Sequence, residues 1–210
     1  MKVFALAANA YLLDTPQGPL LVDAGMPGQR HRLEGYLGSV KPAALLLTHH
    51  HLDHVGGARM LWERYGLPIY AHPLDIPFIS GEARRPPFPP IPWLGDWIAN
   101  SPRPVPKEAL TPVEEGAEVL GWQVVHLPGH TPGQIGLLRE GVLLAADALR
   151  VGAKGPWVPP AMVNHDTQQA RRTVGKIARL EAQKIYVGHG PPTTQQAVKA
   201  LAKRLGLPEQ

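Results

Sequence analysis

The sequence predicts a mixed α/β (α+β) protein in which two β-sheets pack together and helices lie on the outside. Two observations support this fold class. Short apolar runs that are typical of strands alternate with amphipathic segments that are typical of helices. The strand-like runs form two groups, one in each half of the chain, and helix-like segments follow each group.

The length and hydropathy of the chain limit its organisation and location. With 210 residues we expect one domain over residues 1–210. No run approaches the roughly 18 to 20 apolar residues that a membrane span needs, so we expect no membrane partner. The first residues, MKVFALAANAYLLDT, have an apolar patch shorter than a signal peptide requires, and a first strand explains them better. We therefore expect a cytoplasmic protein.

The composition excludes several kinds of chemistry. The chain has no cysteine, which rules out disulfides, thiolate zinc sites and a cysteine nucleophile. Any bound metal must therefore be held by histidine, aspartate or glutamate. The net charge of +4 is mild and no run of five or six basic residues occurs, so charge gives no support for a nucleic-acid partner.

In the first half, apolar runs bounded by turn residues predict strands, and apolar residues at helical spacing predict helices. Ala58, Leu61 and Tyr65 share one face of the second predicted helix. The predicted strands are residues 3–7, 10–13, 20–22, 43–47 and 67–72, and the predicted helices are residues 29–37 and 56–66.

Residues 73–112 form a segment that is dense in proline and aromatic residues. So much proline does not fit a helix interior or a central strand, so we expect an extended insert. Four of its aromatic residues either line an apolar pocket or fix the insert to the domain; they are Phe78, Phe88, Trp93 and Trp97. Both a lid and a plain surface connection fit this segment, and an exposed apolar rim on it also fits a contact in a homodimer.

The second half reads as a run of strands followed by two helices. Asp166 and Gln169 have the spacing of a capping box, and Ala170, Val174 and Ile177 lie on one face of the helix that follows. The predicted strands are residues 118–120, 123–127, 135–138, 142–146 and 184–187, and the predicted helices are residues 164–183 and 193–205.

Residues 48–54, THHHLDH, follow a buried strand-like run and hold four of the ten histidines of the chain. His49 and His51 are two apart, so a locally extended backbone directs both imidazoles to the same side. Asp53 and His54 stand where the next helix begins, and a carboxylate is favoured there by the exposed amides and the helix dipole. We expect Gly56 and Gly57 to allow a tight turn.

Three further acids or histidines stand at the ends of other apolar strands. His130 occurs in LPGHTPG, Asp147 in LLAADAL and His189 in IYVGHGPP. Because several strand ends can meet at one edge of a sheet, these side chains can converge with the THHHLDH histidines on a metal. Imidazole and carboxylate suit zinc, iron or manganese.

This ordered set resembles the metallo-β-lactamase superfamily, whose pattern is His-x-His-x-Asp-His followed by a further His, an Asp and a last His. The resemblance runs from about residue 9 to residue 192, and LLVDAG with Asp23 agrees with the early Asp-x-Gly turn of the family. It implies a four-layer αββα sandwich of two mixed β-sheets with outer helices, the metallo-β-lactamase fold.

The resemblance also implies a cofactor of two divalent metal ions, with Zn²⁺ favoured and Fe or Mn as alternatives. The first-metal ligands would be His49, His51 and His130, the second-metal ligands Asp53, His54 and His189, and the bridging ligand Asp147. Asp23 either accepts a hydrogen bond from a ligand imidazole or caps its own turn.

The expected activity is hydrolysis of a small-molecule ester, lactone or thioester by a hydroxide that bridges two metals. Asp53, His54 and Asp147 form the expected catalytic set; Asp53 can orient the nucleophile or relay its proton, and His165 can face the cleft. Asp147 argues against a true β-lactamase, because zinc β-lactamases lack the bridging acid at this place. The chain is similar to the core of glyoxalase II, but the short segment after His189 leads us to expect no glutathione-binding C-terminal domain.

Three alternatives remain at this point. A persulfide dioxygenase of the same scaffold would hold one iron on His49, His130 and Asp147. A phosphodiesterase or RNA-processing relative would share the ligand pattern, although the late histidine motif and the basic arm of transfer-RNA 3′-processing enzymes are not visible. The third alternative is a metal-binding or partner-binding module without catalysis.

Overall fold

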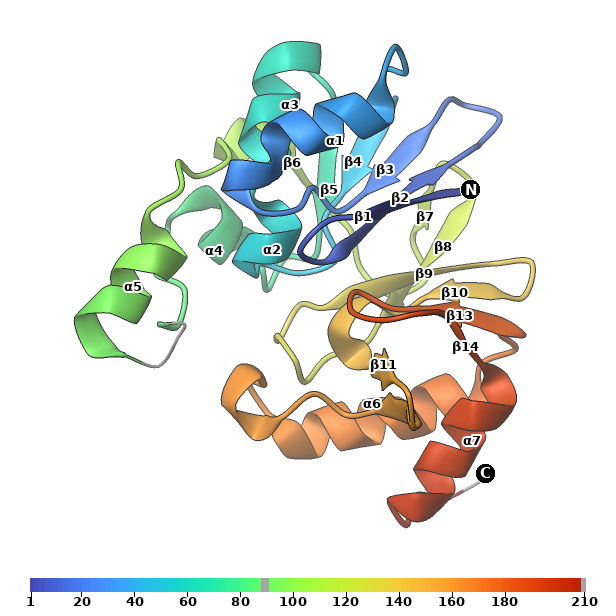
Figure 1. The fold of residues 1–210 in the computed structure, drawn as a ribbon. Coiled ribbons are helices and arrows are strands. Elements are labelled where there is room, and N and C mark those ends of the chain that lie inside the picture. Colours follow the sequence, from blue (N-terminus) through green and yellow to red (C-terminus); the bar gives the residue numbers. More distant parts are fainter. Residues whose placement is uncertain (88–90, 209–210) are drawn as a thin grey trace. The chain divides into compact units, whose positions relative to one another are not determined.

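The computed structural model describes residues 1–87 and 91–208 of the 210 residues. The chain divides into two compact units, unit 1 from Met1 to Val113 and unit 2 from Glu114 to Gln210. Each unit holds a six-stranded mixed sheet with helices on it (Figure 1). Two large mixed sheets with helices are what the sequence predicts.

The sheet of unit 1 has the strand order β1-β2-β3-β4-β5-β6. The first three strands are antiparallel, and β3 to β6 run parallel to their neighbours. The strands are β1 (Lys2–Ala5), β2 (Asn9–Leu13), β3 (Leu20–Val22), β4 (Ala44–Leu46), β5 (Ile69–Ala71) and β6 (Leu110–Pro112). Because β3, β4 and β5 are parallel neighbours, the segments that follow them all leave the sheet at the same edge.

Helices α1 and α3 cover one face of this sheet (Figure 1). Leu33 of α1 and Leu61 of α3 belong to the same buried cluster as Leu45 of β4 and Ile69 of β5. The α-helices of the unit are α1 (Arg30–Leu37), α2 (Leu52–Val55), α3 (Ala58–Tyr65), α4 (Ile76–Ser80) and α5 (Pro92–Asn100), and the 3₁₀ helices are η1 (Pro27–Gln29) and η2 (Lys107–Ala109).

The expectation of an extended insert over residues 73–112 is wrong for the described part of that segment. It holds α4, α5, η2 and the edge strand β6. Proline occurs in the first turn of both α-helices, where its missing N–H costs nothing because the helix leaves that donor unpaired. Prolines at these positions are compatible with helices, so the high proline content of the segment does not exclude them.

The sheet of unit 2 has the order β14-β13-β10-β9-β8-β7. Strands β10 and β13 are parallel, and the other neighbours are antiparallel. The strands are β7 (Glu118–Val119), β8 (Trp122–His126), β9 (Ile135–Arg139), β10 (Val142–Leu144), β13 (Lys184–Tyr186) and β14 (Thr193–Thr194), with a separate hairpin of β11 (Arg150–Gly152) and β12 (Gly155–Trp157). The predictions for this half did not include the hairpin.

Helices α6 (Thr167–Arg179) and α7 (Gln195–Arg204) pack on the sheet of unit 2. Val174 and Ile177 of α6 and Val198 of α7 share a buried cluster with Ile185 of β13. The cap predicted for α6 is confirmed, since the Asp166 carboxylate accepts a hydrogen bond from the Gln169 amide at 2.9 Å. The remaining short helices are η3 (Ala146–Ala148) and η4 (Ala161–Val163).

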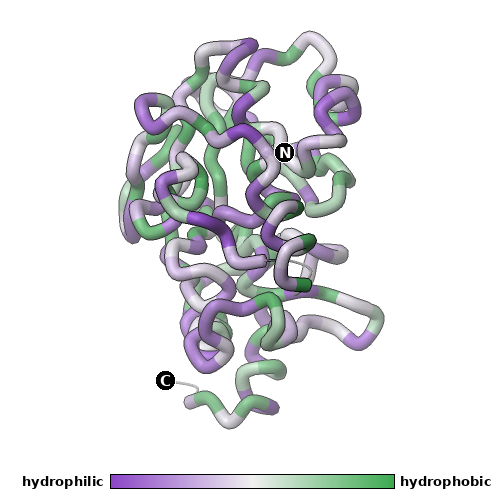
Figure 2. The backbone as a smooth tube through the Cα atoms, turned by 90° about the vertical axis from the view of Figure 1, so that its left-hand side faces the viewer, coloured by the Kyte–Doolittle hydropathy of each residue, from purple (hydrophilic) through white to green (hydrophobic). Residues whose placement is uncertain are grey.

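The hydropathy of the chain follows this packing. Hydrophobic and hydrophilic residues both occur along α7, near the C-terminus (Figure 2), and its buried side chains are those that face the sheet. Among the helices that the structure describes, none has both the length and the hydropathy needed to cross a membrane.

Candidate metal centre

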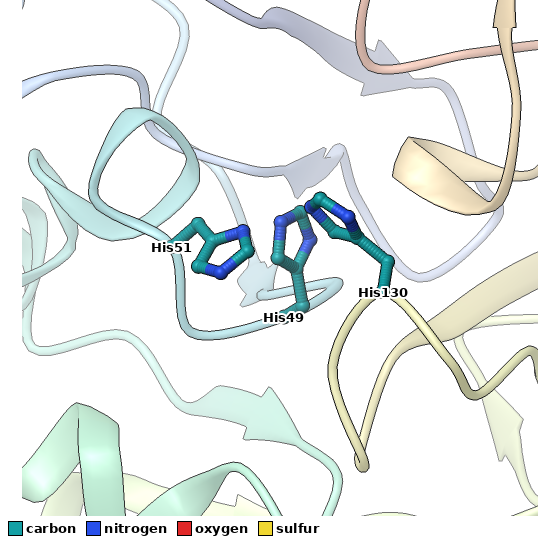
Figure 3. A group of neighbouring side chains, drawn as sticks. All are labelled: His49, His51 and His130. Carbon is teal, nitrogen blue, oxygen red and sulfur yellow. The ribbon is translucent and has the colours of Figure 1, made fainter. Parts of the chain in front are cut away.

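Four candidate ligands of unit 1 lie on the segment that follows the buried strand β4. We call His49, His51, Asp53 and His54 the first ligand set. The ring centroid of His49 lies 4.8 Å from that of His51 and 4.0 Å from that of His54. Figure 3 shows the side chains of His49 and His51 on this loop. Asp53 and His54 lie on α2, and a carboxylate oxygen of Asp53 is 3.8 Å from His54 Nε2. The segment thus gathers three imidazoles and one carboxylate.

Two glycines behind this loop allow a close approach of backbones. A Cβ on Gly56 would lie 2.3 Å from the backbone nitrogen of Pro27, and a Cβ on Gly57 would lie 2.5 Å from the carbonyl oxygen of Ala24. Both glycines have negative φ angles and right-handed conformations. The two glycines form the expected turn, between α2 and α3, and they also let these helices approach the segment after β3.

Asp23 follows β3 and holds the loop from behind. Its carboxylate accepts hydrogen bonds from the Thr48 amide at 2.9 Å and from Thr48 Oγ1 at 2.8 Å, and its Oδ2 lies 2.7 Å from His54 Nδ1. All three residues are buried. A carboxylate here requires the proton of His54 on Nδ1, so Nε2 is the ring nitrogen that can coordinate a metal.

The same reasoning determines the tautomer of His49. Its Nδ1 lies 3.1 Å from Thr48 Oγ1. Because Thr48 donates its single hydroxyl proton to Asp23, Oγ1 acts as an acceptor toward the imidazole. The Nδ1–H tautomer again directs Nε2 of His49 to a metal.

Unit 2 carries the second ligand set, which is His130, Asp147 and His189. Asp147 follows β10 and is 1% exposed. Its Oδ2 lies 3.5 Å from His130 Nε2, 3.3 Å from His189 Nε2 and 3.3 Å from a guanidinium nitrogen of Arg150. A buried carboxylate between two imidazole Nε2 atoms is an arrangement that suits a ligand shared by two cations.

His130 lies on the turn between β8 and β9, which Figure 3 also shows. Its Nδ1 lies 3.1 Å from the side-chain oxygen of Asn164, and its carbonyl accepts a hydrogen bond from the His165 amide at 3.0 Å. Asn164 therefore sets the same Nδ1–H tautomer that Asp23 sets in unit 1. The sequence predictions missed this role of Asn164; its only signal was a polar side chain just before α6.

Two buried ionic residues near the first ligand set were also missed. Asp75, which follows β5, accepts a hydrogen bond from the His50 amide, and Arg85 donates one to the His50 carbonyl. Arg150 of unit 2, beside Asp147, was missed as well. Nothing in the local sequence distinguishes these side chains from surface charges.

The residues expected to line a substrate pocket lie in different environments. Phe78 stacks on the His50 imidazole with ring centroids 4.4 Å apart. Trp93 and Trp97 are 77% and 66% exposed, and His165 is exposed. Phe88 lies outside the described residues.

The chemistry of both ligand sets fits a divalent metal. Their donors are imidazole nitrogens and carboxylate oxygens, which zinc, iron and manganese accept. A second protein group holds Nδ1 of three of the histidines, namely His49, His54 and His130, and such outer partners are typical of metal-ligating histidines.

Comparison with known proteins agrees with this chemistry. A sequence model of the metallo-beta-lactamase superfamily matches residues 3–189. The chain is 28% identical over 240 residues to "Probable metallo-hydrolase YflN" of Bacillus subtilis (strain 168), covering 94% of this chain and 88% of that protein. It is 30% identical over 190 residues to a hydroxyacylglutathione hydrolase of Alkalilimnicola ehrlichii, covering 88% of this chain and 62% of that enzyme.

Solved structures show the same fold. A crystal structure of TTHA1623 in a di-iron-bound form has a TM-score of 0.71 and 33% identity, with 92% of each chain covered. The BLEG-1 B3 metallo-β-lactamase has a TM-score of 0.70 and 25% identity, with 93% of this chain and 94% of that chain covered. The metallo-β-lactamase fold expected from the sequence is thereby confirmed. The chain belongs to the metallo-β-lactamase superfamily, a family of metal-dependent enzymes.

Proposed function

We propose that this enzyme is a metallo-hydrolase that binds two divalent metal ions and cleaves a small ester, lactone or thioester. In this proposal the two ligand sets act together. The first metal is assigned to His49, His51 and His130, the second to Asp53, His54 and His189, and Asp147 to both. Membership of the superfamily and the identity of the donor atoms support the assignment.

The observation that carries the proposal is the environment of Asp147. The Oδ2 atom of this buried carboxylate lies 3.5 Å from Nε2 of His130 and 3.3 Å from Nε2 of His189. A carboxylate is expensive to bury, and pairing with cations is the usual compensation. An acid at this position offsets the mutual repulsion of two nearby cations, as a bridging ligand does.

Bound metals would supply a hydroxide at neutral pH and polarise the carbonyl of the substrate. The chain's own residues then have separate tasks. Asp23 and Asn164 keep the protons of His54 and His130 on Nδ1. The side chain of Asp53 is 28% exposed and so remains within reach of solvent, which suits it to accept a proton from the nucleophile and to pass it to the leaving oxygen or sulfur.

The substrate class follows from what this chain shares with its relatives. The hydroxyacylglutathione hydrolase that it resembles acts, by its name, on a thioester-type substrate, and the match covers 62% of that enzyme. We therefore infer that this enzyme catalyses the same class of reaction, hydrolysis of a thioester or a related ester. The di-iron form of TTHA1623 supports iron as an alternative to zinc or manganese.

Elemental analysis combined with a hydrolysis panel tests the proposal. We expect about two equivalents of zinc, iron or manganese per chain, and turnover of a thioester, a lactone or an aryl ester by the purified holoenzyme. Asp147→Asn removes a buried carboxylate and should lower the metal content. It should also lower the turnover rate by at least about 100-fold. Asp14→Asn is the matched control, because its side chain is 75% exposed and pairs with the N-terminal amine.

Two outcomes would contradict the proposal. Folded wild-type protein that takes up no metal when zinc, iron or manganese is supplied would exclude a metallo-hydrolase. About one equivalent of iron, with oxygen consumption on glutathione persulfide and no hydrolysis, would replace the hydrolase by the dioxygenase alternative.

A further inference from the structure

Two buried charged side chains, Asp75 and Arg85, form hydrogen bonds with the backbone amide and carbonyl of His50. His50 stands between His49 and His51 and is 3% exposed. The two side chains that hold it come from the segment after β5 and from the residues before α5, both within unit 1. We call His50, Asp75 and Arg85 the loop clamp.

Asp75 holds the amide side of the clamp. Its Oδ2 accepts a hydrogen bond from the His50 backbone N–H at 2.8 Å and lies 3.0 Å from His50 Nδ1. Asp75 is 1% exposed, so these contacts are screened little by water. One carboxylate oxygen therefore holds the peptide group between His49 and His50 and lies beside the ring of His50.

Arg85 holds the carbonyl side. Its Nε donates to the His50 carbonyl oxygen at 2.9 Å, and its Nη1 donates to the Ala99 carbonyl at 3.3 Å. The residue is 8% exposed, and burial lowers the pKa of Arg85 to about 10, so it stays protonated at neutral pH. The guanidinium thus joins the peptide group between His50 and His51 to the end of α5.

The backbone of Arg85 is itself fixed. Its amide donates to the side-chain oxygen of Asn100 at 2.8 Å, and the Asn100 amide group donates to the Arg85 carbonyl at 3.2 Å. Phe78 of α4 stacks on the His50 ring and closes the remaining side. Asp75 lies just before α4 and Arg85 lies between α4 and α5, and hydrogen bonds join them to Ile79 of α4 and Ala99 of α5.

We propose that Asp75 and Arg85 are positioning residues for the metal, which hold His49 and His51 at the spacing that the first metal requires. The hydrogen bonds on the amide and the carbonyl of His50 fix the two planar peptide groups that join it to His49 and His51. The orientation of these peptide groups sets the direction in which the His49 and His51 side chains leave the backbone. A neutral side chain could cap the same backbone groups at a lower desolvation cost. The inference rests on the metal assignment of the proposed function.

Stepwise zinc titration of the metal-free protein against a chromogenic chelator tests the clamp. Arg85→Met and Asp75→Asn should each weaken one of the two zinc equivalents by about 10- to 100-fold, the range observed when outer partners of metal ligands are removed. The other equivalent, assigned to Asp53, His54 and His189, should change less. Arg85→Lys keeps the charge and can still donate to the carbonyl, so it should restore part of the affinity.

The chain offers matched controls for both variants. Arg84 pairs with Asp96 on the surface, where their side chains are 72% and 36% exposed. Arg84→Met removes the same chemical group as Arg85→Met without touching the His50 backbone, and Asp14→Asn, at a side chain that is 75% exposed, does the same for Asp75→Asn. Both control variants should bind zinc as the wild type does. Circular dichroism of each metal-free variant establishes that the compared proteins are folded.

The outcomes separate this inference from the proposed function. Equal zinc affinity in wild type and in folded Asp75→Asn and Arg85→Met would overturn the positioning role. Tighter binding by Arg85→Met would also overturn it, because it would indicate simple charge repulsion between Arg85 and the metal. An equal loss at both equivalents would also overturn it, because a general loss of stability acts on both. A wild type that binds no zinc, iron or manganese would overturn the metal assignment itself, and the clamp with it.

Discussion

Histidine tautomers are set residue by residue in this protein. Thr48, Asp23 and Asn164 each engage Nδ1 of one ligand candidate, at 3.1, 2.7 and 3.1 Å. Each contact holds the proton on Nδ1 and presents the lone pair of Nε2, which lowers the entropic cost of binding a metal. The chemistry of the candidate centre therefore depends as much on these three acceptors as on the imidazoles.

A second effect at this scale is the pH dependence of the α6 cap. Hydrogen bonding from the Gln169 amide lowers the pKa of the Asp166 carboxyl below its usual range. A lowered pKa in the folded state gives stability that is present above the usual value of about 4 and lost as the pH falls through the lowered value. Asp166→Asn still caps the helix but carries no charge.

We therefore expect the melting temperature of the wild type to exceed that of Asp166→Asn most at neutral pH, and the difference to shrink below about pH 4. Thermal unfolding of both proteins at pH 7 and pH 3 measures it. A difference that is the same at both pH values would show that the carboxylate charge does not stabilise α6.

At the scale of elements, strand ends gather the ligands within each unit. In unit 1, Asp23, the THHHLDH segment and Asp75 follow β3, β4 and β5, which are parallel neighbours. In unit 2, Asp147 and His189 follow the parallel strands β10 and β13. Since carboxyl ends of parallel strands lie at one edge, each unit brings its polar side chains together there.

The turn that carries His130 depends on close packing against α6. Gly129 has φ +129°, and a Cβ on it would lie 2.2 Å from the backbone nitrogen of Ala170. Gly116 also has a positive φ, +81°, but a Cβ there would meet nothing within 4 Å. Alanine substitutions at Gly116 and Gly129 therefore distinguish two effects: both introduce backbone strain, but only the one at Gly129 also makes a Cβ collide with α6.

Gly116→Ala should destabilise the protein by about 1–2 kcal/mol, the cost of a left-handed conformation for a residue with a Cβ. Gly129→Ala should cost more and should also reduce zinc affinity, because relieving the collision displaces His130. Urea unfolding and zinc titration of both variants measure the two effects. Full zinc affinity in Gly129→Ala would show that the turn adjusts without moving the imidazole.

At the scale of the whole molecule, metal binding should add to stability, because the folded chain binds the metals and the unfolded chain does so weakly. At a free metal concentration of about 1,000 times Kd, each site contributes about 4 kcal/mol. For a chain of this size that raises the melting temperature by about 8–16 °C per site.

We expect a strong chelator to lower the melting temperature and added zinc to restore it, with a smaller shift in Asp147→Asn. Differential scanning calorimetry on the same preparation measures the shift. A metal-loaded wild type, verified by elemental analysis, that melts at the same temperature after chelation would show that the metals do not contribute to folding stability.

Local sequence was sufficient for most elements. Strand β3 has the predicted bounds, Leu20–Val22, because a short apolar run between turn residues has few other solutions. Helix α6 begins at the predicted cap, Asp166, since capping depends only on residues three apart. Asp53 and His54 were expected where the next helix begins; they lie on a separate short helix, α2, that precedes α3. The proline-rich segment was predicted incorrectly, because contacts with the rest of unit 1 stabilise α4 and α5 there.

The candidate ligands and their order can be recognised in the amino-acid sequence, because they are histidines and acids that directly follow buried strands. The side chains that hold those ligands become visible only once the chain is folded. Asp23 reaches His54 across 31 positions, Arg85 reaches His50 across 35, and Asn164 reaches His130 across 34. Contacts over such separations depend on how strands and helices pack, and neither residue type nor local spacing carries that information.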